Sequence, residues 1–214
     1  MNVSDHDSGG NDLPLPRRAV ILASASVARA RMLDDAGVPF EVIPATVDED
    51  DIKASMTAAG ADATTLAEGL AEAKARAIAR RYPDRLVIGA DQTLACGGVL
   101  YDKPADRAAA RRQLMELRGR MHELVSAACV FRGSEREWRY RDTARLWVRP
   151  FGDAFLDRYL ARCGDEALTS VGAYQLESVG AQLFSRIEGD WFTILGLPLL
   201  PLLDYLRTRQ VLTT

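Results

Sequence analysis

The chain has 214 residues, 48% hydrophobic and 27% charged, with a formal net charge of -3, which is an ordinary globular composition. It contains no apolar run of about 18 residues, so no membrane-spanning helix is predicted, and it lacks the basic excess typical of nucleic-acid-binding proteins. We therefore expect neither a membrane nor a nucleic acid as a partner. With only two histidines in the chain, a zinc site built on histidine is not expected either.

The composition of residues 1–16 indicates how the chain is divided into domains, and the cysteines indicate its cellular compartment. Residues 1–16 are rich in small, polar and Pro residues and lack the basic and apolar regions of a secretory signal. We expect them to be a disordered tail, followed by a single domain over residues 17–210. Cys96, Cys129 and Cys163 lie far apart, and their odd number favours free thiols in a reducing compartment. A cytoplasmic location is therefore predicted.

Apolar runs with β-branched residues alternate with Ala- and Leu-rich stretches of helical spacing, and these patterns predict strands and helices respectively. In chain order we expect a strand at 18–23, a helix at 26–36, a strand at 40–44, a helix at 65–81, a strand at 85–91, a helix at 104–117, strands at 121–131 and 138–148, and helices at 155–163 and 198–207. The acidic residues 47–51 are expected to be a loop or a helix start, and residues 96–99, with two adjacent glycines, a hairpin turn. A hairpin-like pair in the middle indicates an α/β fold with a mixed sheet flanked by helices, not a purely parallel sheet.

The first candidate for a binding site is the turn between the first expected strand and helix. Ser24 and Ser26 lie in this turn, and Arg29 follows in the first turn of the helix. Free backbone N–H groups, two hydroxyls and a guanidinium at a helix N-terminus are suited to holding a phosphate. The alternative is an ordinary helix cap with exposed arginines, which the local pattern taken alone favours.

Two further candidates lie later in the chain. Asp91 and Gln92 follow the strand expected at 85–91, where ligands gather in open α/β sheets, and Lys103 comes shortly after. Clustered glycines and polar residues around Glu177, and again at Gly196, suggest backbone that approaches a ligand. Taken singly, each of these features is also explained by tight turns and helix caps.

Together, in order, these features resemble the Maf family. The resemblance extends from about residue 21 to 207, and it implies an α/β/α fold with two lobes around a central cleft. It also implies hydrolysis of nucleoside triphosphates between the α- and β-phosphates with a divalent metal, Mg²⁺ or Mn²⁺. The matching positions are Ser24, Ser26 and Arg29, residues 71–75, residues 89–92, Lys103 with Pro104, residues 119–122, residues 172–174, and residues 196–198.

The resemblance also implies roles for individual residues. Asp91 matches the family's proposed catalytic base, and Glu49 matches an acidic position near the metal, so these two carboxylates are the expected metal ligands. Arg29, Lys74 and Lys103 match basic groups that face the triphosphate. A triphosphate needs fixed cations and a metal to hold it while charge moves to the leaving pyrophosphate. Without the resemblance, Lys74 would be interpreted as a solvated helix residue.

The base of the substrate is indicated by a few positions. Gln92 and Glu177 are similar to the 7-methyl-GTP type of the family, whereas the dTTP/UTP type has Thr and Gln there. A carboxylate at Glu177 can accept hydrogen bonds from the paired donors of guanine. Ala28 departs from this type, which has a large aromatic residue at that position that stacks on a cationic base. Trp191 is a candidate to supply the aromatic ring in its place.

The predicted function is thus a nucleoside triphosphate pyrophosphatase that removes modified nucleotides, with 7-methyl-GTP as the expected substrate, and a homodimer is a possible assembly. The alternatives are a dTTP/UTP-type enzyme, a nucleotide-binding regulator of cell division and septum formation, and a sugar-nucleotide or other phosphate-ester enzyme on a similar fold.

Overall fold

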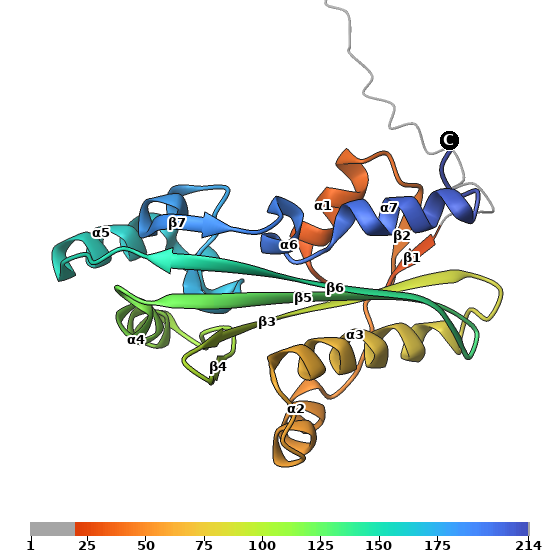
Figure 1. Cartoon of the computed structure of the whole chain (residues 1–214), viewed down its shortest axis with the longest axis horizontal. Coiled ribbons are helices and arrows are strands. Elements are labelled where there is room, and N and C mark those ends of the chain that lie inside the picture. Colours follow the sequence, from red (N-terminus) through yellow and green to blue (C-terminus); the bar gives the residue numbers. More distant parts are fainter. Residues whose placement is uncertain (1–19, 214) are drawn as a thin grey trace, which may run out of the picture.

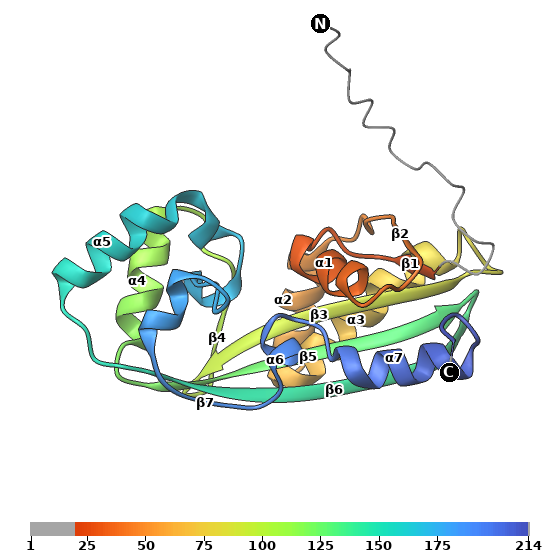
Figure 2. The same ribbon diagram turned by 90° about the horizontal axis from the view of Figure 1, so that it is seen from above.

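The structure is a computed structural model that describes residues 20–213 (Figures 1 and 2). The predicted disordered tail, residues 1–16, lies outside the described residues, and the division of the chain into a tail and one domain stays a prediction. No helix in the described part of the chain is long and apolar enough to cross a membrane.

Seven strands form one mixed sheet in the order β2-β1-β3-β5-β6-β7, with β4 paired to β3. The strands β2, β1 and β3 run parallel to one another, and the remaining pairs are antiparallel. The prediction of a mixed α/β sheet is therefore confirmed. The strands are β1 Val20–Leu22, β2 Phe40–Val42, β3 Leu86–Cys96, β4 Val99–Tyr101, β5 Met121–Arg132, β6 Glu135–Val148 and β7 Phe184–Glu188.

Helices cover both faces of the sheet. At one end, α1 and α7 lie on one face and α3 lies on the other, with α2 beside α3; at the other end, α4 and α5 form a second group (Figures 1 and 2). The α-helices are α1 Val27–Asp35, α2 Glu49–Ala58, α3 Ala63–Ala79, α4 Arg107–Leu117, α5 Asp153–Cys163, α6 Trp191–Ile194 and α7 Leu199–Thr208, and the 3-10 helices are η1 Gly164–Leu168, η2 Val171–Ala173 and η3 Val179–Leu183.

Three hydrophobic clusters define two lobes. In the first lobe, Ile88 packs in the cluster under α1 and α7, while Val87 packs in the cluster against α3. In the second lobe, Leu94 packs in the cluster formed with α4 and α5. The strand β3 contributes to all three clusters, so residues between Ile88 and Leu94 lie where the two lobes meet.

The strand β3 is longer than its sequence predicts. Its pairing with β5 continues from Leu86 to Ala95, so Asp91 lies in the middle of the strand and not at its carboxyl end. The polar residues 91–93 interrupt the apolar run, so the sequence predicts that the strand ends there. Pairing with the distant strand β5 extends it further. The prediction of a hairpin turn is correct: Gly97 and Gly98 both have positive φ, at 60° and 82°, between β3 and β4.

No strand or helix was predicted where β4, β7, α6 and the 3-10 helices lie, and of α2 only a loop or helix start was expected. The expected loop or helix start at 47–51 is the start of α2, where the side chain of Asp48 accepts a hydrogen bond from the N–H of Asp51. Acidic residues in the first turn favour this helix through its dipole. No residue of α2 is buried, so it shows no apolar periodicity that would reveal its length.

Candidate functional site

The candidate site lies at an open stretch of one edge of β3. On this edge, β1 pairs as far as Leu22 with Ile88, and β4 pairs only from Leu94 onward. Between them, residues 89–93 have no paired strand on this side among the described residues. The chain leaving β1 carries Ser24 toward this stretch, and the chain leaving β4 carries Lys103 toward it from the opposite direction. The topology therefore directs the predicted phosphate-binding residues to Asp91 from both sides.

Asp91 forms the centre of a buried charge cluster. Its side chain faces α3, where the ammonium of Lys74 lies 2.6 Å from Asp91 Oδ1. The same ammonium lies 3.0 Å from Glu49 Oε1 at the start of α2. Lys74 and Asp91 are each only 10% exposed at the side chain. The structure thus brings together three residues that the sequence predicts from three separate segments, and it rules out the solvated alternative for Lys74.

Close packing of α3 against β3 makes this contact possible. A Cβ at Gly89 would lie 2.1 Å from the carbonyl oxygen of Ala71 and 2.7 Å from the Cβ of Ala75, so only glycine fits there. Because Lys74 follows Ala71 by about one helical turn, the close approach of this turn brings its ammonium within reach of Asp91.

The turn after β1 is built as expected. The hydroxyl of Ser26 accepts a hydrogen bond from the N–H of Arg29 at 3.3 Å and caps α1. The hydroxyl of Ser24 accepts from the N–H of Ser26 at 3.2 Å and from Nη1 of Arg29 at 3.1 Å. Arg29 is not exposed as the capping alternative predicts: it is buried, and its Nε donates to the carbonyl oxygen of Gly196 at 2.7 Å. Burial lowers the pKa of Arg29, while the charges of Asp91 and Glu49 act to raise it.

Lys103 extends this positive charge from the other side. Lys103 as a whole is exposed, but its ammonium lies close enough to the buried cluster for its pKa to be affected. Burial lowers this pKa, and the like charges of Arg29 and Lys74 lower it further. Glu49 and Asp91 act in the opposite direction. An added polyanion would relieve the repulsion among these three cations.

Gln92 faces the opposite side of the sheet from Asp91, as strand alternation requires. Its amide Nε2 donates to the hydroxyl of Ser126 at 2.9 Å and to the carbonyl oxygens of Thr193 and Ile194, both at 3.0 Å. These bonds fix α6 to the sheet, and Oε1 of Gln92 accepts no hydrogen bond from residues 20–213. The sequence did not predict Ser126 and Thr193 as residues of the site. Near them in the structure, only Gly196, in the Gly-Leu-Pro motif at 196–198, was singled out from the sequence.

The remaining candidates for base recognition are less constrained. Glu177 lies exposed in a turn between η2 and η3, and no hydrogen bond or ion pair engages it within residues 20–213. Ala28 is half-buried in the first turn of α1. Trp191, at the start of α6, is 46% exposed. Gln92 donates to the carbonyl oxygens of Thr193 and Ile194 in the same short helix.

The residues present fit a divalent metal only in part. Glu49 and Asp91 converge on one point, since both contact the ammonium of Lys74. Among residues 20–213, no group of three or more His, Cys, Asp or Glu side chains could hold a metal ion. Mg²⁺ commonly binds through one or two carboxylates together with substrate phosphates. A metal bound here would therefore need oxygen atoms of the ligand to complete its coordination.

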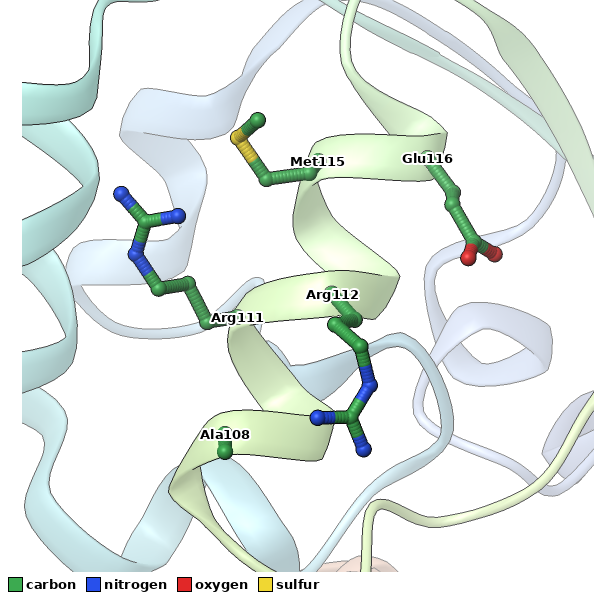
Figure 3. Close-up of a pocket in the computed structure, with 5 residues that line it drawn as sticks. All are labelled: Ala108, Arg111, Arg112, Met115 and Glu116. Atoms are coloured by element: carbon green, nitrogen blue, oxygen red, sulfur yellow. The ribbon is translucent and has the colours of Figure 1, made fainter.

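A separate surface hollow lies on α4, away from these residues. It encloses about 430 Å³ and is lined by one stripe of the helix (Figure 3). Arg111 in this stripe is paired with Asp157 at 3.2 Å. None of the predicted site residues lines the hollow, so it is not part of the candidate site. The lining residues are Ala108, Arg111, Arg112, Met115 and Glu116.

The mixed α/β fold thus places three cations, Arg29, Lys74 and Lys103, around the carboxylates of Asp91 and Glu49. The chain belongs to the Maf-like protein family, whose model matches residues 19–209. A nucleoside triphosphate pyrophosphatase from Granulibacter bethesdensis is 53% identical over 194 residues, covering 91% of this chain and 98% of the relative. A 7-methyl-GTP pyrophosphatase from Rhizobium meliloti is 53% identical over 188 residues, covering 88% and 94%. The predicted family and enzyme class are therefore confirmed.

Proposed function

We propose that this protein hydrolyses nucleoside triphosphates to a nucleoside monophosphate and pyrophosphate. The observation that supports it best is the position of Asp91 in the open stretch of β3, in direct contact with Lys74. Ser24 and Arg29 approach this stretch from one side and Lys103 from the other. A linear triphosphate has the shape and charge to lie along such an edge.

The cations perform the electrostatic part of the reaction. Negative charge builds up on the bridging oxygen as the bond between the α- and β-phosphates breaks. Arg29, Lys74 and Lys103 are fixed by the fold before the substrate binds, so they stabilise this charge without reorganising. Arg29 is held most firmly, because Ser24 and Gly196 accept hydrogen bonds from its guanidinium.

Asp91 performs the proton transfer. Its carboxylate accepts a proton from a water molecule whose oxygen bonds to phosphorus, while the bridging P–O bond breaks and pyrophosphate leaves with the electron pair. Positioned general bases of this kind contribute about 10²- to 10⁴-fold. Lys74 orients the carboxylate through its contact with Oδ1. Mg²⁺ or Mn²⁺ held by Glu49, Asp91 and the substrate phosphates would add Lewis-acid stabilisation of the phosphate oxygens.

The proposed substrate is 7-methyl-GTP, which the enzyme would remove from the pool of modified nucleotides. Two acceptors support this choice: Oε1 of Gln92, which its amide bonds hold in place, and the carboxylate of Glu177, which pairs with no group in residues 20–213. Guanine presents N1–H and amino donors that such acceptors can bind. The relative from Rhizobium meliloti, named for activity on 7-methyl-GTP, is 53% identical to this chain.

A substrate panel tests the proposal. The purified protein is incubated with Mg²⁺ or Mn²⁺ and 7-methyl-GTP, GTP, dTTP, UTP or ATP, and the products are identified. We expect monophosphate and pyrophosphate, fastest with 7-methyl-GTP, and no activity with EDTA. Orthophosphate as the first product would overturn the bond assignment, and faster turnover of dTTP or UTP would overturn the base assignment. Tight nucleotide binding without any turnover would favour the regulatory alternative.

A further inference from the structure

An ion pair outside the predicted site joins α2 to the segment after β4. The ammonium of Lys53 lies 2.5 Å from Oδ1 of Asp102, across 49 residues of sequence. Lys53 comes one helical turn after Glu49, so the two side chains lie on the same face of α2. Asp102 directly precedes Lys103. The pair therefore links the helix that carries one proposed metal ligand to the segment that carries one proposed phosphate-binding cation.

The helix α2 is held to the rest of the protein by few contacts. None of its residues is buried. It packs on α3 where Met56 lies over Gly69, so closely that a Cβ on that glycine would be 2.5 Å from the methyl carbon of Met56. Its other attachment at the site is the contact of Glu49 with Lys74. An element with so little buried apolar surface has low local stability, so its position depends on polar contacts.

The other partner of the pair is anchored more firmly. The carbonyl oxygen of Asp102 accepts a hydrogen bond of 2.7 Å from Nε2 of Gln113 on α4. Pro104, two residues later, is buried. The segment around Lys103 is thus attached to the second lobe, and the carboxylate of Asp102 is the group that extends from it to α2.

The electrostatic surroundings of Lys103 and Lys53 differ. Burial lowers the pKa of Lys103, and the like charges of Arg29 and Lys74 lower it further, against the attraction of Glu49 and Asp91. For Lys53 the balance is opposite: burial lowers its pKa, but the hydrogen bond and charge of Asp102, together with the charges of Asp91 and Glu49, outweigh burial and raise it. The ion pair of Lys53 with Asp102 is therefore an attractive contact in the same segment as Lys103, a cation that the neighbouring cations disfavour.

We propose that Lys53 and Asp102 are positioning residues that hold Glu49 and Lys103 in the arrangement needed to bind the triphosphate, an inference that rests on the proposed function. Neither side chain contacts the reacting atoms in this role. Because Asp102 is 73% exposed at the side chain, the pair contributes little to global stability. Its effect is local, on the order of α2 and on substrate binding.

Four variants test the pair: Lys53→Gln, Asp102→Asn, the double variant, and Arg111→Gln as a control. Arg111 pairs with Asp157 at similar exposure, but on α4 and α5, away from the site. We expect each single variant to raise KM for the nucleotide about two- to tenfold, and the double variant to raise it no further, since both changes remove one interaction. Amide hydrogen exchange over residues 49–58 should become faster in all three and stay unchanged in the control.

Other outcomes would overturn the proposal. If Asp102→Asn lowers KM while Lys53→Gln raises it, Lys53 binds the phosphates directly, and Asp102 competes for it. Additive effects, or unchanged exchange in α2, would show that the two residues do not act as a pair. If the wild-type protein turns over no nucleotide, the proposed function fails, and the exchange measurement alone then decides whether the pair orders α2.

Discussion

The ammonium of Lys74 and the carboxylate of Asp91 lie 2.6 Å apart, although they come from a helix and a strand on different layers of the fold. They meet because Gly89, two residues before Asp91, has no side chain to keep α3 away from β3. Glu49 adds a second carboxylate to the same ammonium at 3.0 Å. This relationship connects the packing of the core to the proposed chemistry, and the predictions below probe both.

Replacing Asp91 with Asn tests its role as the base. The change keeps the shape of the side chain but removes the proton acceptor, so kcat should fall by at least ~10²-fold. Circular dichroism should show that the variant folds, because asparagine still accepts a hydrogen bond from Lys74. Turnover close to that of the wild type would show that Asp91 serves only as a partner of Lys74.

Replacing Gly89 with Ala tests the close packing of α3. The added methyl group would overlap the carbonyl of Ala71, so α3 must shift and the protein should lose about 1–3 kcal/mol of stability. The same shift should lower kcat, because Lys74 moves with the helix. Denaturant unfolding measures the first effect and steady-state kinetics the second.

Gly152→Ala is the matched control for this change. A Cβ at Gly152 meets no atom within 4 Å, and its backbone is extended, so we expect little effect on stability. Equal stability of the two variants would contradict the packing argument.

Replacing Glu177 with Ala tests base recognition. If its carboxylate accepts hydrogen bonds from guanine, its loss should cost ~1–3 kcal/mol. The value of kcat/KM for 7-methyl-GTP should then fall roughly ten- to a hundredfold, while that for UTP changes little. Because Glu177 is exposed and engages no described residue, the fold should be unaffected. An equal loss with all bases would reject the base-reading role.

Acid stability tests the buried histidine of the second lobe. His122 is fully buried, its Nε2 lies 2.6 Å from the hydroxyl of Tyr174, and burial lowers its pKa to about 4 from 6.5. The unfolded chain binds a proton below about pH 6.5 and the folded protein only below about pH 4. As the pH falls from about 6.5 to about 4, this group therefore lowers the free energy of unfolding by up to ~3 kcal/mol.

The variant His122→Gln should not show this part of the acid dependence. Unfolding free energies measured at several pH values between 4 and 7 should fall less steeply for the variant than for the wild type. Parallel pH profiles would mean that the imidazole is protonated in the folded protein over the same range as in the unfolded chain.

Much of this protein follows from local sequence patterns. The capping of α1 by Ser26 and the turn at Gly97 and Gly98 are set by interactions between residues close in the chain, and local periodicity indicates most helices and strands. The order of motifs also indicated the family, and with it Asp91 and Glu49 as expected metal ligands and Lys74 as a group expected to face the triphosphate. Such features are local, so they can be read without knowing the fold.

Other features depend on residues distant in sequence. The strand β3 continues past Asp91 because β5 pairs with it, and only the start of α2 was indicated because none of its residues is buried. The amide of Gln92, expected only to face the base, binds Ser126 and the chain around Thr193. Nothing in the local sequence marked Lys53 as a candidate residue, because its partner Asp102 is 49 residues away in the chain. Tertiary structure decided these points, since it alone determines which polar groups from separate segments meet once the core has packed.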